Sequence, residues 1–251
     1  MIKSSNGIQW IEPEWPAPAQ VRAVSTLRSG GVSNPPFASL NLALHVGDAV
    51  NDVYENRRRI EHAFQLPNQP CWLQQVHGVI AVEAGTFNSP PEADASYTRE
   101  SNTVCSVMTA DCLPILFCTK QGDRVAAAHA GWRGLVGGVL ESAVQALNCP
   151  PAHLLAWLGP AIGQKSFEVG DEVRTAFSAR NSINENCFVR NSNQRWWADI
   201  YALARNELLQ LGVQDIFTDT SCTVTDASRF FSYRRDGQTG RMASMIWLQP
   251  R

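Results

Sequence analysis

Two histidines and one cysteine are the residues of this 251-residue sequence whose type and position suggest chemistry. His77 and His129 each end an apolar run beside a glycine-containing turn, and Cys112 lies in a polar break between two apolar runs. A strand end fixes a side chain, and neighbouring glycines let a ligand approach the backbone. Two imidazoles and a thiolate form a zinc-binding set that leaves one coordination position open, and copper accepts the same ligands. The three residues lie far apart in the sequence, so their spacing alone does not distinguish a metal site from unrelated side chains.

The same side chains also allow covalent catalysis. Cys112 could act as a nucleophile with His129 or His77 as its base. Asp111, which precedes the cysteine, could orient that base or simply cap a turn. A thiolate beside a cation or a metal ion has a lowered pKa, so both interpretations need the same electrostatic surroundings.

Anion binding is a second expectation for the segment around His129. Glycines at 131, 134, 137 and 138 predict a glycine-rich turn before a helix, and the free N–H groups at a helix start favour an anion. Arg133 lies in this turn, and Arg28 lies beside two glycines, so both are candidates for binding phosphate. Arg234 and Arg235 are weaker candidates, whose simpler role is a surface ion pair. The full set of predicted ligand-binding residues is Arg28, Asn41, Asp111 and Arg133.

Composition restricts the class of protein. The sequence is 44% hydrophobic and 18% charged, with a net charge of −2, which is typical of a globular domain and argues against nucleic acid as the main partner. No apolar run reaches the ~20 residues of a membrane helix, and residues 1–15 lack the apolar core of a signal peptide. We therefore expect no membrane partner and a cytoplasmic location. Seven cysteines without a CxxC pair predict buried thiols rather than a disulfide framework.

The apolar patterns predict one α+β domain over residues 1–251 in which strands outnumber helices. Residues 1–20 are predicted to be an extended N-terminal arm. Between residues 71 and 129 successive strands follow without a long helix, which predicts a mainly antiparallel or mixed sheet. Pro114 favours an edge strand or a bulge. The predicted strands are 21–27, 39–44, 71–77, 79–82, 103–108, 113–118, 125–129, 154–158, 216–218, 222–224 and 242–248. The predicted helices are 53–65, capped by Asp52, and 139–147, 171–179 and 199–211.

Five segments carry a resemblance to a known family. They are Gln75-Val76-His77-Gly78, Thr109-Ala110-Asp111-Cys112, His129-Ala130-Gly131-Trp132-Arg133-Gly134, Gly159-Pro160-Ala161-Ile162-Gly163 and Phe231-Ser232-Tyr233-Arg234-Arg235-Asp236-Gly237. In this order they resemble the motifs of the YfiH-like family, also named the laccase-domain or polyphenol oxidase family. The resemblance extends from about Arg28 to Leu248. It implies a four-layer α/β/β/α sandwich and a catalytic zinc ion bound by His77, Cys112 and His129.

The resemblance also implies a purine nucleoside enzyme. Its expected reactions are phosphorolysis of adenosine, inosine and methylthioadenosine, and deamination of adenosine, with a purine nucleoside and phosphate as partners. Zinc is the expected metal, with copper as the alternative. A laccase-type copper centre needs on the order of ten histidines, whereas this sequence contains 5.

Two further functions stay open from the sequence. The family's sandwich resembles that of cysteine-dependent deamidating toxins, and some members are linked to editing of peptidoglycan precursors, for which Cys112 would attack and His129 would act as base. A zinc-binding protein without catalysis is the other alternative. Only three protein ligands are found, whereas a structural zinc site is usually closed by four.

Overall fold

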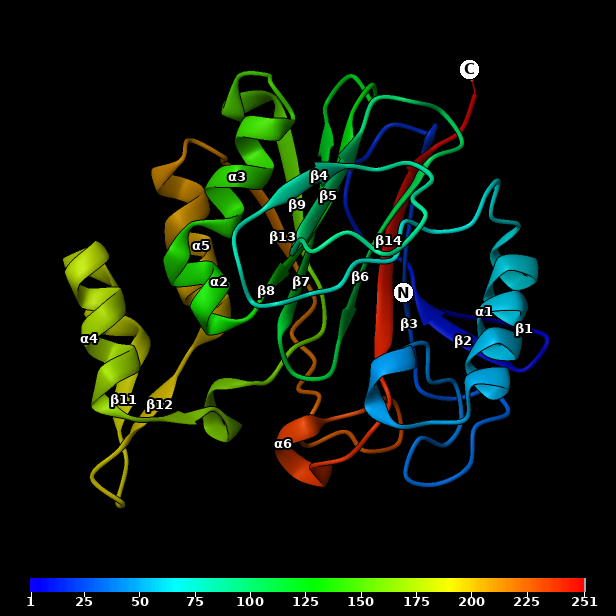
Figure 1. Cartoon of the computed structure of the whole chain (residues 1–251). Helices are drawn as coiled ribbons and strands as arrows, with labels where there is room; N and C mark the ends of the chain where they lie inside the picture. Colours follow the sequence, from blue (N-terminus) through cyan, green and yellow to red (C-terminus); the bar gives the residue numbers. More distant parts are fainter. Residues whose placement is uncertain (251) are drawn as a thin grey trace.

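Two large β-sheets lie face to face in the computed structural model, which describes residues 1–250, and helices cover their outer faces (Figure 1). One sheet has five strands in the order β1-β2-β3-β14-β6, and the other has six in the order β13-β9-β7-β8-β5-β4. Helix α1 covers the first sheet, whereas α2, α3 and α5 cover the second. This arrangement confirms the predicted four-layer α/β/β/α sandwich and the α+β class.

The elements have the following bounds. The five-stranded sheet contains β1 (Ile2–Ser5), β2 (Ile8–Ile11), β3 (Val21–Thr26), β14 (Met242–Leu248) and β6 (Val104–Thr109). The six-stranded sheet contains β13 (Asp215–Thr218), β9 (Leu154–Leu158), β7 (Leu113–Thr119), β8 (Val125–Ala130), β5 (Ala95–Thr98) and β4 (Ala81–Glu83). A small third sheet contains β10 (Glu168–Val169), β12 (Trp196–Ala198) and β11 (Phe188–Arg190). The helices are α1 (Val50–Phe64), α2 (Trp132–Gly137), α3 (Val139–Ala146), α4 (Asp171–Arg180), α5 (Ile200–Gln210) and α6 (Tyr233–Asp236).

Three apolar cores hold the four layers together. The central core lies between the two sheets, where Val107 and Ile246 of one sheet meet Leu116 of the other. The other two cores lie under the helices, with Ile60 of α1 on one side and Leu203 of α5 on the other. No helix within residues 1–250 is long and apolar enough to cross a membrane.

Strand β8 shows how alternation places the candidate histidine. All six of its residues are buried. Its even-numbered alanines pack in the core under the helices, whereas Val125 and Ala127 pack in the core between the sheets. Since side chains alternate along a strand, His129 belongs to the inter-sheet face, at the end of the strand where the two sheets meet the loops.

The N-terminal segment differs from the predicted arm. Strands β1 and β2 pair as an antiparallel hairpin, and Trp10 of β2 pairs with Thr26 of β3. Residues 1–11 therefore extend the five-stranded sheet at its edge. The strand predicted at 39–44 is also wrong: these residues form a loop that leads into a 3₁₀ turn at Leu44–Val46. Helix α1 begins at Val50 with Ala49 as its N-cap, so Asp52 lies in the first turn rather than capping the helix.

The segment before His77 is a loop rather than a strand. Residues 71–77 make only two isolated bridges, from Cys71 to Cys105 and from Gln74 to Glu92. Similarly, the predicted strand at 222–224 makes a single bridge from Cys222 to Ala161.

The prediction of an edge position for Pro114 is wrong. Strand β7 lies inside the six-stranded sheet, between β8 and β9. Pro114 is the second residue of that strand, opposite His129, and its carbonyl accepts the N–H of Gly159. A proline at a strand start loses little because few ladder bonds precede it.

The glycine-rich segment after His129 is helical. Gly131 is the N-cap of α2, and α3 follows immediately after Gly138, which has φ +105. Gly138 provides the left-handed conformation that ends one helix and begins the next. The sequence predicted the second of these helices but described the first as a turn. The predicted helices at 171–179 and 199–211 are confirmed, and Asp199 caps the latter by accepting the N–H of Ala202.

Candidate metal centre

The fold brings His77, Cys112 and His129 together. Their ligand atoms all lie within 4.8 Å of one another, and Cys112 Sγ is 3.8 Å from His77 Nε2. Tetrahedral zinc with bonds of about 2.0–2.3 Å has ligand atoms roughly 3.3–3.8 Å apart. The donor set and its spacing therefore fit one such ion with a small inward adjustment. Each residue comes from a different part of the sandwich: the 71–80 loop, the β6–β7 turn and the end of β8.

A buried carboxylate orients the centre. Asp94 is 0% exposed, and its Oδ1 lies 2.7 Å from His129 Nδ1. The same carboxylate accepts the backbone N–H groups of Val76, His77 and Gly78, at 3.2, 3.0 and 2.6 Å. The bond to Nδ1 directs His129 Nε2 toward the ligand position. The Asp94 carboxylate thus fixes the ring of His129 and the backbone of His77.

One ligand, and the residue before another, adopt left-handed backbone conformations. His77 has φ +60 and Asp111 has φ +96. Such conformations are unusual for residues other than glycine and persist where surrounding contacts hold them. At His77 the contacts are the N–H bonds to Asp94. At Asp111 they are bonds to its carboxylate from the Thr223 hydroxyl (2.6 Å), the Ser232 hydroxyl (3.0 Å) and the Arg234 N–H (2.7 Å).

The electrostatics of the site favour the thiolate. Burial raises the pKa of Cys112, but the imidazoles of His129 and His77 outweigh burial, so this pKa lies below that of an ordinary thiol. Burial by itself lowers the pKa of His129, whereas Cys112 and Asp94 raise it above its usual value. The thiolate is the form of cysteine that binds metals and attacks electrophiles.

Because Gly131 has no side chain, the side chains of His77 and Cys112 can lie close to its backbone. A Cβ atom at this position would lie 2.6 Å from Cδ2 of His77 and 3.1 Å from Sγ of Cys112. Its φ of −67 is one that any residue adopts. The glycine is therefore required by close approach rather than by backbone conformation.

Replacing Gly131 with alanine is expected to weaken metal binding with little loss of stability. His77 is exposed, so its ring can move away from the new methyl group, but it then leaves the ligand position. Competition with a chelator should show a fall in zinc affinity of about tenfold or more, in the range of outer-shell changes at metal sites. Gly85→Ala is the matched control, because no atom lies within 4 Å of a Cβ there. Equal zinc affinities for the two variants would contradict the assignment of His77.

A cavity of about 470 Å³ opens beside the three ligands. Its lining also includes His45, Tyr233 and Arg241. Nη1 of Arg241 donates to the carbonyls of Thr239 and Gly240, at 2.8 and 3.0 Å. Arginine carries five donors in a planar fork, so the Nε and Nη2 groups remain for an anion in the cavity. A cavity of this size can hold a nucleoside-sized ligand.

The structure does not bring the predicted anion-binding residues to this cavity. Arg28 donates to the carbonyls of Ala38 and Ala227, and its guanidinium lies 4.7 Å from the centre of the Phe231 ring. Arg133 is exposed in the first turn of α2 and stacks on Trp132.

The two remaining substrate-site candidates have their side-chain polar atoms bonded within the protein. Asn41 is fully buried, and its Oδ1 accepts the N–H groups of Ala43 and Arg241. It therefore supports the cavity from behind, next to Arg241. The carboxylate of Asp111 joins the β6–β7 turn to α6, as described above.

The weaker candidates Arg234 and Arg235 have structural partners. Nη1 of Arg234 donates to the carbonyl of Glu168 at 3.0 Å, while Arg235 pairs with Asp236 and donates to the carbonyl of Phe230. The pair of Arg235 with Asp236 is the ion pair that the sequence predicts as the simpler role.

Sequence reasoning missed two residues that shape the site. Asp94 directly precedes β5, whose sequence Ala-Ser-Tyr-Thr has no apolar pattern that predicts a buried carboxylate before it. Arg241, which ends the loop before β14, carries no pattern that separates it from other loop arginines. Its place beside the ligands depends on strand pairing between residues more than a hundred positions apart.

Comparison with known proteins identifies the family. Residues 22–249 match the family model described as multi-copper polyphenol oxidoreductase laccase. The chain belongs to the YfiH-like, or laccase-domain, family. It is similar to a purine nucleoside phosphorylase of Pseudomonas aeruginosa, with 54% identity over 96% of this chain and 98% of the relative. It is also similar to purine nucleoside phosphorylase YfiH of Escherichia coli, with 53% identity over 95% of this chain and 98% of the relative.

Solved structures agree with this assignment. A Neisseria meningitidis protein of family DUF152 matches with a TM-score of 0.93 and 44% identity, covering 98% of this chain and 100% of that chain. YlmD of Geobacillus stearothermophilus matches with a TM-score of 0.91 and 31% identity, covering 99% of this chain and 98% of that chain. Family membership predicted from the five motifs is therefore confirmed.

Proposed function

We propose that this protein is a zinc-dependent purine nucleoside phosphorylase that converts adenosine, inosine and methylthioadenosine to the free base and the sugar 1-phosphate. Deamination of adenosine and a cytoplasmic location are part of the same proposal. The observation that carries it is the convergence of two imidazoles and a thiolate beside a cavity that Arg241 also lines. The names of relatives that match almost the whole chain support the same reaction.

The ligand residues would hold zinc at the inner end of the cavity. When bound there, the ion supplies a Lewis acid that activates water or polarises an oxygen or nitrogen of the substrate. The chain's own contribution is positional: Asp94 fixes the direction of the His129 ring, and its bonds to the 76–78 backbone fix His77. With three protein ligands, one side of the centre stays directed to the substrate cavity.

Arg241 is the residue that we assign to phosphate. It faces the cavity, and burial lowers its pKa; a guanidinium nevertheless remains cationic at neutral pH. Its free donors would hold a phosphate oxygen next to the ribose while Tyr233, which lines the same cavity, presents an aromatic ring to the nucleoside. Phosphorolysis needs such a group, because phosphate must reach the sugar carbon as the base departs.

The two arginines give a direct comparison. Arg241→Ala should raise the KM for phosphate about 10- to 100-fold, which corresponds to losing a charged hydrogen bond of roughly 1.5–3 kcal/mol. Arg28→Ala should leave this KM within about twofold and instead lower the melting temperature, because three bonds to backbone carbonyls are lost. Steady-state kinetics at varied phosphate, together with thermal unfolding, checks both outcomes. The reverse pattern would restore Arg28 as the phosphate ligand.

A product analysis tests the function itself. Zinc-quantified protein is incubated with adenosine in the presence and absence of phosphate, and bases, nucleosides and sugar phosphates are separated. Adenine and ribose 1-phosphate should appear together and only with phosphate, whereas inosine should appear in either buffer if the protein also deaminates adenosine. Adenine formed equally without phosphate would identify a hydrolase and would contradict phosphorolysis.

Cysteine-based hydrolysis is the second candidate function, and the position of Cys112 beside His77 supports it. The thiol is 3.8 Å from His77, and its pKa is lowered, which are the requirements of a nucleophile pair. Chelation separates the two mechanisms: removing zinc should abolish phosphorolysis but should leave or increase a thiol-dependent reaction.

A multi-copper oxidase is less compatible with the chain. Within residues 1–250, His77, Cys112 and His129 are the one group of three or more candidate ligands whose atoms converge. The centres of multi-copper oxidases require further histidine clusters. A single copper ion in place of zinc remains the alternative for this site.

A further inference from the structure

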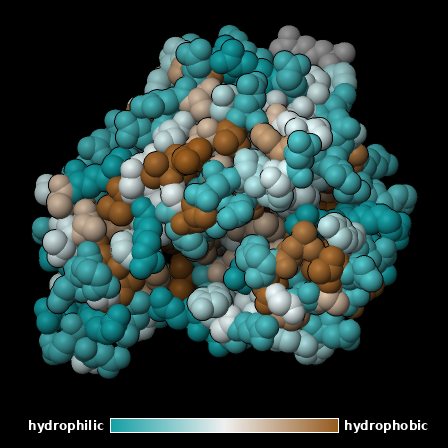
Figure 2. Space-filling model, in the orientation of Figure 1, coloured by the Kyte–Doolittle hydropathy of each residue, from teal (hydrophilic) through white to brown (hydrophobic). Residues whose placement is uncertain are grey.

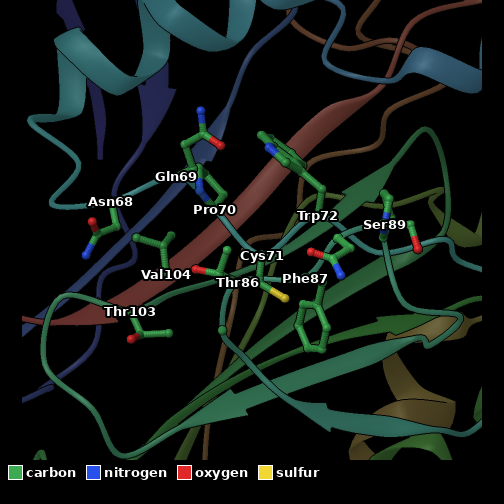
Figure 3. A pocket seen from close by; sticks show the side chains of 13 residues that line it. Asn68, Gln69, Pro70, Cys71, Trp72, Thr86, Phe87, Ser89, Thr103 and Val104 are labelled. Atoms are coloured by element: carbon green, nitrogen blue, oxygen red, sulfur yellow. The ribbon is translucent and has the colours of Figure 1, made fainter.

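A second cavity, of about 420 Å³, lies apart from the metal centre. One wall is the segment 68–72, which follows α1, and the other is the loop 85–90, which follows β4; Thr103 and Val104 complete it at the start of β6 (Figure 3). It shares no lining residue with the cavity beside His77 and Cys112. Its volume lies in the range of small-molecule sites.

The lining of this cavity is uncharged. No acidic, basic or histidine side chain contributes to it. Three amides, three hydroxyls and two aromatic rings do contribute, namely Asn68, Gln69, Asn88, Thr86, Ser89, Thr103, Trp72 and Phe87. In Figure 3 the Cys71 thiol lies beside the Phe87 ring. A phosphorylated ligand would find no cation to pair with, so the chemistry selects an uncharged compound.

Several polar groups in the lining are free to bind a ligand. Nδ2 of Asn68 donates to the carbonyl of Asn102, which leaves its Oδ1 as an acceptor. Within the part of the chain that the structure describes, the side chains of Gln69 and Asn88 have no protein partner. Amide side chains of this kind form two-point hydrogen bonds with the edge of a purine base.

One wall of the cavity is held in place by the rest of the fold. Trp72 is fixed by Arg57, whose guanidinium lies 4.0 Å from the ring centre and donates to the carbonyl of Leu42 at 3.0 and 2.8 Å. The same wall is bonded from Cys71 N–H to the Val104 carbonyl and from Gln74 N–H to the Pro91 carbonyl, both 2.9 Å. A wall that is already ordered loses less entropy when a ligand binds.

We propose that this cavity is a second, non-catalytic binding site for an uncharged purine base. Aromatic rings bind the faces of a base by stacking, and the amides bind its edge. The base released by the proposed phosphorolysis belongs to this class, and the lining favours such a base whether or not that reaction occurs. The two walls continue directly to His77 and Asp94, which connects the site to the metal centre through a few residues of backbone.

Binding of adenine to the Cys112→Ala, Tyr233→Ala double variant tests this site without turnover. The double variant alters the metal-centre cavity and leaves the second cavity intact, and titration calorimetry measures the dissociation constant. Adding Phe87→Ala should weaken adenine binding about tenfold or more, as expected for the loss of stacking worth about 1–3 kcal/mol. Phe87 is 43% exposed, so its truncation leaves the core intact.

The controls separate the alternatives. Ile183→Ala, an exposed apolar side chain on a 3₁₀ segment away from the cavity, should leave the dissociation constant unchanged. Adenosine monophosphate should bind at least tenfold more weakly than adenine, because the cavity offers no cation. Absence of adenine binding, binding that is insensitive to Phe87→Ala, or displacement of adenine by N-acetylglucosamine would each overturn the proposal. None of these outcomes depends on phosphorolysis.

Discussion

Replacement of Cys112 with alanine should remove both the metal and phosphorolysis. Cys112 supplies the one thiolate of the centre, and the adjacent imidazoles favour its ionised form. Losing a direct ligand should lower zinc affinity by more than the 10- to 100-fold typical of outer-shell changes. Elemental analysis after dialysis should then find little zinc, and kcat/KM for adenosine with phosphate should fall by about 10³-fold or more.

The control for this variant is another cysteine. Cys149→Ala removes a partly exposed thiol outside the cavity and should retain zinc and activity. In the metal-free wild-type protein, iodoacetamide should modify Cys112, and zinc should protect it. A Cys112→Ala protein that keeps stoichiometric zinc would contradict the ligand assignment. Loss of activity with full zinc content, together with activity that survives chelation of the wild type, would favour the thiol mechanism.

The elements predicted correctly are those whose apolar pattern is local. Strands β6, β7 and β8 and helix α5 each have a core face that can be counted along the sequence. The segment 71–77 has the same kind of composition but forms a loop. Cys71 still bonds to β6, but the N–H groups of Val76 and His77 bond to the Asp94 carboxylate instead of to a neighbouring strand. The composition of the segment does not predict this loop, because the loop depends on the side chain of Asp94, which lies elsewhere in the sequence.

The phosphate candidates illustrate a second limit. Arg28 and Arg133 were attractive because each is near glycines, but a glycine indicates backbone freedom or close approach and not the direction of a neighbouring side chain. Arg28 turns toward the Ala38 and Ala227 carbonyls, whereas Arg241 faces the cavity. The direction of each arginine side chain depends on how β14 and the segment 226–231 pack against the rest of the fold. Such packing is set by contacts that are distant in sequence.

Exposed apolar side chains lie close to the metal ligands. The face in Figure 2 is mostly hydrophilic, with small separate apolar patches. Next to the metal ligands, however, Val76, Val79 and Ile80 are 44%, 37% and 54% exposed. Scattered apolar side chains are ordinary on a protein surface. Arg241 is the arginine among the residues that line the cavity, so it is the group there that can bind an anion.

Among substitutions outside the three ligands, the isosteric change Asp94→Asn should have the largest effect on stability and on zinc affinity. The carboxylate accepts four bonds, from His129 Nδ1 and from three backbone N–H groups. An asparagine of the same shape offers one oxygen and turns an NH₂ group toward donors. At least one buried N–H then loses its acceptor, at a cost of about 1–3 kcal/mol. Thermal unfolding of the metal-free protein should detect this loss.

The metal readout separates positioning from simple instability. Below the unfolding temperature, Asp94→Asn should still lower zinc affinity by about 10- to 100-fold, because His129 loses the carboxylate that fixes its ring orientation and basicity. Asp215→Asn makes the same chemical change in a surface ion pair with Lys120 and should leave zinc affinity unchanged. A destabilised Asp94→Asn protein that binds zinc as tightly as the wild type would limit Asp94 to holding the 76–78 loop. Weakened binding with an unchanged KM for nucleoside would instead place its effect on the metal ligands themselves, where the bond to His129 Nδ1 acts.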